Sequence, residues 1–363
     1  MSSSFGKNIK ISIFGQSHST GIGVTVDGLP CGFEPDMEAL SEFMARRAPG
    51  KNKLSTKRKE GDEFEVLSGM ADGKFCGAPF CAVIRNSDTR SGDYSNLRDV
   101  PRPGHADFTA NVKYGGNQDV AGGGHFSGRL TAPMCIAGGI LKQVLESEGI
   151  YIGAHIKRVK DVEDLSFDPV NVSPSDFKEV LKNEIPVISP SQGDKMKEVI
   201  ISASQMGDSV GGVIECAVVG LPVGVGDPMY DGMENKIAAS VFAVPAIKGI
   251  EFGIGFEASK LYGSENNDSF RVKDGKVVTE TNNHGGILGG ISSGMPIIFR
   301  VAVKPTPSIF KEQKSVSLSK MEDTALQIKG RHDPCIVQRA VPCIEAAAAI
   351  AVYDALLDYK KEL

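Results

Sequence analysis

The chain repeats short stretches of its own sequence, and this internal echo constrains the fold more than any other feature. Two pairs of segments share residues: VDGLPCG at 26–32 with VVGLPVG at 218–224, and GGHFSGR at 123–129 with GGISSGM at 289–295. The separations of the two pairs differ, so the chain is not a tandem repeat. The pattern predicts a single domain over residues 1–363 with pseudo-symmetric halves, roughly 1–150 and 200–363.

Residues 98–129 concentrate glycine and cationic side chains. Seven glycines stand there beside six residues that are Arg, Lys or His. Glycine lets backbone N–H groups approach an anion, and arginine donates in a fixed fork that suits phosphate. The segment also contains His105 and His125, and histidine changes its charge most readily near neutral pH. A ligand-binding or catalytic loop is favoured over a plain structural loop.

Periodicity predicts regular elements around this loop. Strands are expected at residues 9–14 and 24–29, and two more at 64–85 around a turn. Asp36 is expected to cap a helix that stops before Pro49, and residues 130–149 read as a buried helix. Residues 155–200 are loosely patterned, with two short helices expected. In the tail, Asp333 and Pro334 read as the N-cap and first residue of a long helix.

Composition narrows the classes of function. Forty basic and 45 acidic residues give a net charge of -5, so no global field favours nucleic acid or an anionic membrane. Seven cations lie between residues 46 and 59; they fit a solvated face or a small polyanion site. RNA binding is the alternative, but no aromatic residue between Phe43 and Phe64 could stack on a base.

Other features point to a cytoplasmic enzyme. The longest uncharged apolar run, residues 346–353, is too short to span a bilayer, and the start has no signal-peptide pattern. The seven cysteines form no metal-type CxxC pair, and no metal is expected. They are expected to pack as small apolar residues.

Several long motifs together resemble the chorismate synthase family. They cover the chain from about residue 5 to 358 in the order GQSHSTGIGVTVDGLPCG, RRAPGKNKLSTKR, SGDYSNLRDVPRPGHADFT, GGGHFSGR, NHGGILGGISSGMPI, KPTPSI and KGRHDPCIVQRAVP. The resemblance implies an α+β fold in which a helical layer lies between two antiparallel sheets with pseudo-symmetric halves. It also implies a homotetramer.

The resemblance further implies a reaction. 5-Enolpyruvylshikimate-3-phosphate would lose its phosphate and a C6 hydrogen in an anti 1,4-elimination that gives chorismate, the last step of the shikimate pathway towards the aromatic amino acids. Reduced FMN would be required without net redox change. Matched by motif, His18 would protonate the departing phosphate, and His105 would keep the reduced flavin in its active protonation state. Asp333 would work with flavin N5 to remove the C6 proton.

The resemblance also implies binding residues. The flavin contacts would be His125, Phe126, Ser127, Pro245, Ala246, Gly289, Lys304, Pro305, Thr306, Pro307, Ser308 and Arg331. Arg47 and Lys53 match positions for NADPH or for a substrate anion. Arg129, together with Arg331, would grip the substrate phosphate or carboxylates.

The chain departs from the family pattern at three places. Gln16 and Ser19 stand where many relatives read GESHG, which removes a charge beside His18. His125 replaces a fixed cation near the flavin, and Lys53 replaces an arginine and its bidentate fork. A built-in flavin reductase that uses NADPH stays open, although the chain has no strand–GxGxxG–helix fingerprint.

Overall fold

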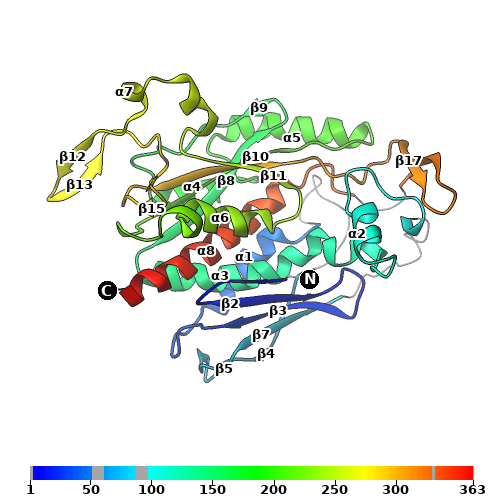
Figure 1. The fold of residues 1–363 in the computed structure, drawn as a ribbon, viewed down its shortest axis with the longest axis horizontal. Coiled ribbons are helices and arrows are strands. Elements are labelled where there is room, and N and C mark those ends of the chain that lie inside the picture. The colour runs from blue at the N-terminus through cyan, green and yellow to red at the C-terminus, as the bar shows by residue number, and fades with distance from the viewer. Residues whose placement is uncertain (1–2, 51–60, 87–96, 329–331, 363) are drawn as a thin grey trace.

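Two antiparallel sheets enclose a layer of helices (Figure 1). The computed structural model describes residues 3–50, 61–86, 97–328 and 332–362. Each sheet has five strands, and the helices α1, α3, α6 and α8 fill the space between them. The expected architecture is therefore confirmed.

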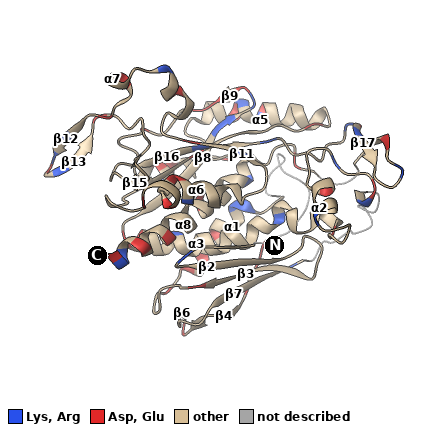
Figure 2. Cartoon of the chain, in the orientation of Figure 1, with Lys and Arg blue, Asp and Glu red and all other residues tan. Residues whose placement is uncertain are grey.

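The first sheet comes from the N-terminal part of the chain. Its order is β1 (Ser4–Phe5), β2 (Lys10–Gly15), β3 (Gly21–Asp27), β7 (Phe80–Arg85) and β4 (Glu65–Ser68). The small hairpin of β5 (Met70–Ala71) and β6 (Lys74–Phe75) interrupts the stretch between β4 and β7. Side chains such as Ile11, Val24 and Ile84 are buried beneath the helical layer. Charged residues are sparse on this sheet and frequent on the outer loops and helices (Figure 2).

The second sheet contains a strand that the sequence analysis missed. Its order is β11 (Ile247–Phe252), β16 (Ile297–Val303), β10 (Gly212–Val219), β8 (Tyr151–Val159) and β9 (Val162–Glu163). Strand β8 contacts α8 on one face and α4 (Pro174–Val180) and α5 (Pro190–Gln205) on the other. Because both faces are covered, β8 lacks the apolar–polar alternation that marks a half-exposed strand. The expected pair of short helices exists, but α5 is 16 residues long.

The helical layer depends on two adjacent glycines. Helix α3 (Thr131–Ser147) packs on α8 (Val337–Glu362). Helix α1 (Met37–Arg47) packs on both, and α6 (Met233–Phe242) packs on α8. A Cβ on Gly138 would lie 2.3 Å from the Cβ of Ala346 on α8. A Cβ on Gly139 would lie 2.6 Å from Leu40 on α1. Larger side chains at these positions would push the three helices apart.

Helix α8 is the core of the molecule. Among the described helices it is the one long and apolar enough to cross a membrane, yet 94% of its most apolar window is buried inside the fold. It begins at Val337, so the expectation that Asp333 and Pro334 start it is wrong. The Asp333 side chain pairs instead with Arg339 on the first turn of the helix.

The internal echo corresponds to equivalent structure. Gly28 follows β3 with φ 96°, and Gly220 follows β10 with φ 85°, a conformation that glycine adopts without strain. Each turn leads towards a helix, α1 or α6, that packs on the long helix of its half, α3 or α8. The first pair of echoed segments therefore has the same turn conformation in both places, and the division of the chain into two halves stays a prediction.

The remaining elements lie at the two ends of the molecule. At one end are α2 (Asp107–Lys113) and the hairpin β17 (Gln313–Ser317)–β18 (Glu322–Leu326). At the other are α7 (Gly263–Asn266) and the hairpins β12 (Phe270–Lys273)–β13 (Lys276–Thr279) and β14 (Ile287–Leu288)–β15 (Ile291–Ser292). Four cysteines are buried, as expected, but Cys31 and Cys76 are exposed.

Candidate active site

Three consecutive glycines bring two predicted catalytic histidines together. Gly122, Gly123 and Gly124 all have positive φ values, between 55° and 89°. A Cβ on Gly122 would lie 2.1 Å from Cε1 of His18, and one on Gly123 would lie 3.1 Å from Nε2 of His105. Both imidazoles therefore lie against bare backbone, although they are far apart in the sequence. Only glycine allows this approach.

His105 is oriented by a carboxylate that the sequence analysis did not single out. Its Nδ1 lies 2.7 Å from Oδ1 of Asp107, so its Nε2 points towards the glycines. Asp107 also accepts hydrogen bonds from Arg102 at 2.7 and 2.8 Å. Burial alone would raise the pKa of Asp107, but the bonds from Arg102 and His105 outweigh burial and hold that pKa well below its usual range. The carboxylate stays charged and keeps the ring in place.

The KPTPS segment, residues 304–308, lies against the loop that contains His105. Nζ of Lys304 donates to the carbonyl oxygen of Gly104 at 2.7 Å, and Nη1 of Arg102 lies 3.4 Å from Oγ of Ser308. Burial, together with repulsion from Lys248, lowers the pKa of Lys304. Asp107 offsets the charge of Arg102, so it is the Lys304 cation that favours an anionic ligand at this contact.

His125 contacts protein groups through both ring nitrogens. Nδ1 lies 2.7 Å from the carbonyl oxygen of Gly15, so Nδ1 carries the hydrogen. Nε2 lies 2.7 Å from Oγ of Ser3, within hydrogen-bond distance. His125 therefore ties the N-terminal segment to the loop that contains His18. Phe126, the next residue, is partly exposed and lies against the Tyr114 ring.

A cavity of about 390 Å³ is lined by two further residues predicted to contact the flavin. His125 and Pro245 both line it, together with Leu130, Met134 and Ala243. Ala246 follows Pro245 with φ 75°, and its carbonyl oxygen accepts from the backbone N–H of Lys304. The cavity therefore adjoins the strand end that leads into KPTPS.

A second carboxylate holds the two predicted anion-binding arginines. Asp62 accepts from Nε of Arg47 at 2.6 Å and from Nη1 of Arg129 at 3.0 Å. Both arginine side chains are at most 5% exposed. Nη1 of Arg47 also lies 3.3 Å from Oγ1 of Thr131. In the sequence, Asp62 is marked only by its place: it is an acidic residue shortly after the seven cations at 46–59.

The remaining predicted residues do not all lie at this place. Gly289 lies in the turn between β14 and β15, at the opposite end of the molecule from α2 (Figure 1). The Oγ of Ser127 accepts from the backbone N–H of Arg129 and caps a short 3-10 turn. Pro305, Thr306 and Pro307 lie in the loop beside Gly104. Lys53 and Arg331 fall outside the described residues.

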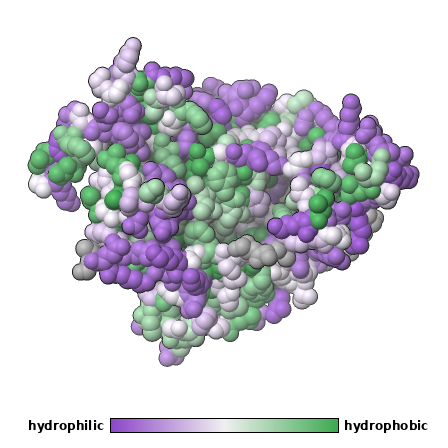
Figure 3. All heavy atoms as spheres, viewed as in Figure 1, coloured by the Kyte–Doolittle hydropathy of each residue, from purple (hydrophilic) through white to green (hydrophobic). Residues whose placement is uncertain are grey.

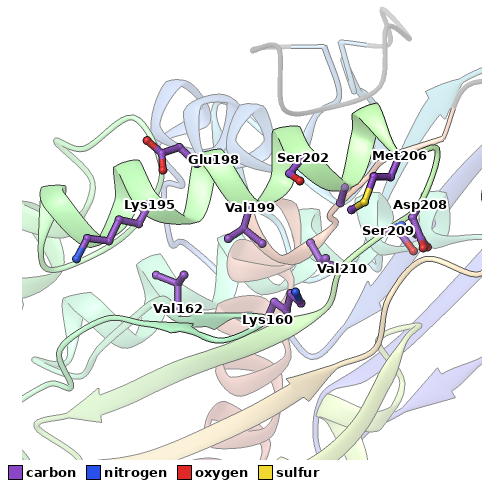
Figure 4. Close-up of a pocket in the computed structure, with 11 residues that line it drawn as sticks. Lys160, Val162, Lys195, Glu198, Val199, Ser202, Met206, Asp208, Ser209 and Val210 are labelled. Atoms are coloured by element: carbon purple, nitrogen blue, oxygen red, sulfur yellow. Dashed lines mark hydrogen bonds between the residues drawn. The ribbon is translucent and has the colours of Figure 1, made fainter.

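A larger hollow lies elsewhere. It measures about 670 Å³ and runs along α5, with Val199, Ser202 and Met206 directed towards Lys160 and Val162 (Figure 4). None of the predicted site residues lines it. His125 lines the smaller cavity, and the neighbouring glycines 122 and 123 contact His18 and His105, so we take this region as the candidate site.

The residues around the smaller cavity suit a phosphorylated flavin. Leu130, Met134, Ala243 and Pro245 offer an apolar wall for a ring system. Lys304 and the glycine backbone at 122–124 offer donors for anionic and carbonyl oxygens.

The fold is of the α+β class, and two histidines meet on the glycine backbone of residues 122 and 123. Comparison with known proteins narrows the class. The family model described as chorismate synthase matches residues 9–357. The chain belongs to the chorismate synthase family, whose members are lyases.

Individual relatives agree with this assignment. A chorismate synthase from Lancefieldella parvula is 45% identical over 100% of this chain and 98% of its own length. One from Thermococcus kodakarensis is 46% identical, with 97% of each chain covered. A crystal structure of chorismate synthase superposes with a TM-score of 0.77 at 26% identity, covering 98% of this chain and 93% of that chain.

Proposed function

We propose that the chain converts 5-enolpyruvylshikimate-3-phosphate into chorismate and phosphate with the help of reduced FMN. The observation that supports this most is the meeting of His18 and His105 on the glycine backbone of residues 122–124. In the reaction, the C–O bond to phosphate and the C6–H bond break, and the electrons remain in the product as a new double bond. No net oxidation or reduction takes place.

Each catalytic side chain has one task. His18 donates a proton to the departing phosphate, and His105, oriented by Asp107, supplies its Nε2 to the flavin edge. Asp333 receives the C6 proton while Arg339 fixes its carboxylate. Reduced FMN, when bound, supplies an electron-rich ring whose N5 takes part in that proton removal. Arg129 and Arg331 hold the substrate anions, and Arg47 with Lys53 holds NADPH or substrate.

An anaerobic assay tests this function. The protein is mixed with FMN reduced by light, the substrate is added, and chorismate absorbance and phosphate release are followed. Product is expected, and its absence with FMN bound would contradict the proposal. A parallel reaction with oxidised FMN and NADPH asks whether the chain also reduces its own flavin, because product there requires that activity.

The same proposal includes a cytoplasmic homotetramer without nucleic-acid or membrane partners. The hairpin β12–β13 projects from the body and exposes Phe270, Val272 and Val277, each more than 60% accessible. It forms a hydrophobic patch at the edge of the face seen in Figure 3. Exposed apolar patches of this kind mark contact surfaces. Sedimentation should give about four times the chain mass of 38.5 kDa, whereas a monomer would contradict the tetramer.

A further inference from the structure

Asp62 has three unusual properties at once. Its side chain is fully buried, its backbone φ is 52°, and its carboxylate binds two arginines. A non-glycine residue in the left-handed region is strained and persists only when its surroundings hold it there. Here the surroundings are Arg47 on α1 and Arg129 just before α3.

On one side the contacts of Asp62 reach the loop that contains His18. Arg129, which binds Oδ1 of Asp62, also donates through Nε to Oδ1 of Asn86 at 2.8 Å. Nδ2 of Asn86 donates to the carbonyl oxygens of Gln16 at 3.1 Å and Ser19 at 2.8 Å. These two carbonyls flank His18, so Asn86 fixes the loop on both sides of the imidazole.

On the other side the contacts reach Asp333. Nε of Arg339 donates to the carbonyl oxygen of Arg47 at 2.9 Å, and the Arg339 guanidinium pairs with the Asp333 carboxylate. Burial lowers the pKa of Arg339, Asp333 opposes this, and the nearby Arg47 cation lowers that pKa further. The charge of Arg47 therefore disfavours the charge of Arg339, and the Asp333 carboxylate favours it.

Among the described residues, this network contains more cations than carboxylates. Arg47, Arg129 and Arg339 carry three positive charges, and Asp62 and Asp333 carry two negative ones. Asp62 contributes the carboxylate shared by Arg47 and Arg129. Without its charge, two buried guanidiniums would face each other unscreened, and both would move.

We propose that Asp62 is a positioning residue that sets the His18 loop and Asp333 in one geometry. The inference rests on the proposed function, in which His18 and Asp333 transfer protons to and from one substrate molecule. An elimination needs the proton donor and the proton acceptor in place together. Asp62 acts through Arg129 and Asn86 on the donor, and through Arg47 and Arg339 on the acceptor.

The test compares Asp62→Asn with Glu345→Gln. Glu345 is a matched control, because it is also a buried carboxylate between two cations, Arg46 and Lys142, but it lies within the helical layer. Turnover with reduced FMN, FMN affinity, melting temperature and hydrogen exchange over residues 15–20 and 332–339 are measured for both variants. Exchange reports the network even when turnover does not.

The expected result separates the two variants. Asp62→Asn should lower kcat by about 100-fold, the scale of a 1 Å misplacement, while its FMN affinity stays unchanged. Exchange should become faster in both segments. Glu345→Gln should lower the melting temperature without affecting kcat or exchange in those segments.

Several outcomes would overturn the proposal. They are wild-type turnover in Asp62→Asn, faster exchange in only one segment or neither, or an equal loss of kcat in Glu345→Gln. If Asp62→Asn does not fold, the half-buried Asn86→Ala decides: it should lower kcat and loosen residues 15–20, and unchanged values would refute the network. If the wild-type protein itself makes no chorismate, the proposed function fails, while the exchange data still decide on Asp62.

Discussion

Arg46 and Arg47 are neighbours at the end of α1, yet they serve two different regions. Each binds a buried carboxylate that also holds a second cation. Arg46 contacts Glu345 at 2.5 and 3.0 Å, and Lys142 contacts the same carboxylate at 2.5 Å. Arg47 contacts Asp62, which also binds Arg129. The chemistry of the two clusters is nearly the same.

The two clusters lie on different kinds of secondary structure. Glu345, Arg46 and Lys142 all stand on helices, α8, α1 and α3, so their cluster joins rigid parts of the core. The ring of Phe43 also lies about 5 Å from both cations of this cluster. Asp62 stands on a loop, and its partners extend to the loops that hold His18 and Asp333. The same ionic contact therefore stabilises the fold in one region and sets the site geometry in the other.

The largest expected effect is on the structural cluster. Glu345→Ala leaves the buried cations of Arg46 and Lys142 without their carboxylate, which should cost about 3–5 kcal/mol of unfolding free energy. Denaturant unfolding measures this loss. The folded fraction should turn over normally, and a fall in kcat per folded molecule would contradict the division between the two clusters.

Substitutions of the catalytic residues should lower turnover more than stability. His105→Ala and Asp333→Asn should fold, bind FMN and turn over at least ~100-fold more slowly, which corresponds to about 2.7 kcal/mol of transition-state stabilisation. The His105 side chain is 16% exposed and that of Asp333 is 10% exposed, so a smaller loss of stability than at Glu345 should accompany the loss of turnover. Steady-state kinetics beside thermal unfolding checks this, and near-normal rates in both variants would contradict the assigned roles.

Acid should weaken the helical layer through Glu345. Burial opposes its charge, but Arg46 and Lys142 outweigh burial and lower its pKa to about 2. A lowered pKa gives stability that is complete above the ordinary value of 4.5 and is lost as pH falls towards 2. The loss between pH 6 and pH 3 should be about 2 kcal/mol. Glu345→Gln, with no charge there to lose, should show a smaller slope, and an equal slope would contradict this origin.

Contacts between residues close in the sequence were predicted in these two regions, and contacts between distant residues were missed. Asp36 was identified as the cap of α1, and its carboxylate accepts from two backbone N–H groups of the first turn. Capping is readable because the partners lie within three residues. The basic end of α1 was also visible, and helix-terminal charge was the plain explanation for Arg46 and Arg47.

The rest depends on the fold. Three residues contact their partners only after the sheets and helices have assembled: Asp62, Asn86 and Glu345. Their spacing in the sequence therefore does not predict these contacts. The buried strand β8 was missed because both of its faces are covered. That the two halves form a single domain stays a prediction, which the close contact of Gly138 with Ala346 supports.

The smallest effect tests the neighbours directly. Arg46→Lys and Arg47→Lys each keep the charge and lose the bidentate fork, so each should cost about 1 kcal/mol of unfolding free energy. Their turnover should differ. In Arg46→Lys the helices hold the core and kcat should stay at the wild-type value. In Arg47→Lys the contacts to Thr131 and Asp62 weaken, so Asp62 no longer holds Arg129 in one position. We therefore expect kcat to fall about 10-fold. Equal kcat values in the two variants would mean that adjacent residues do not divide fold from site, and that the Asp62 network does not position the catalytic groups.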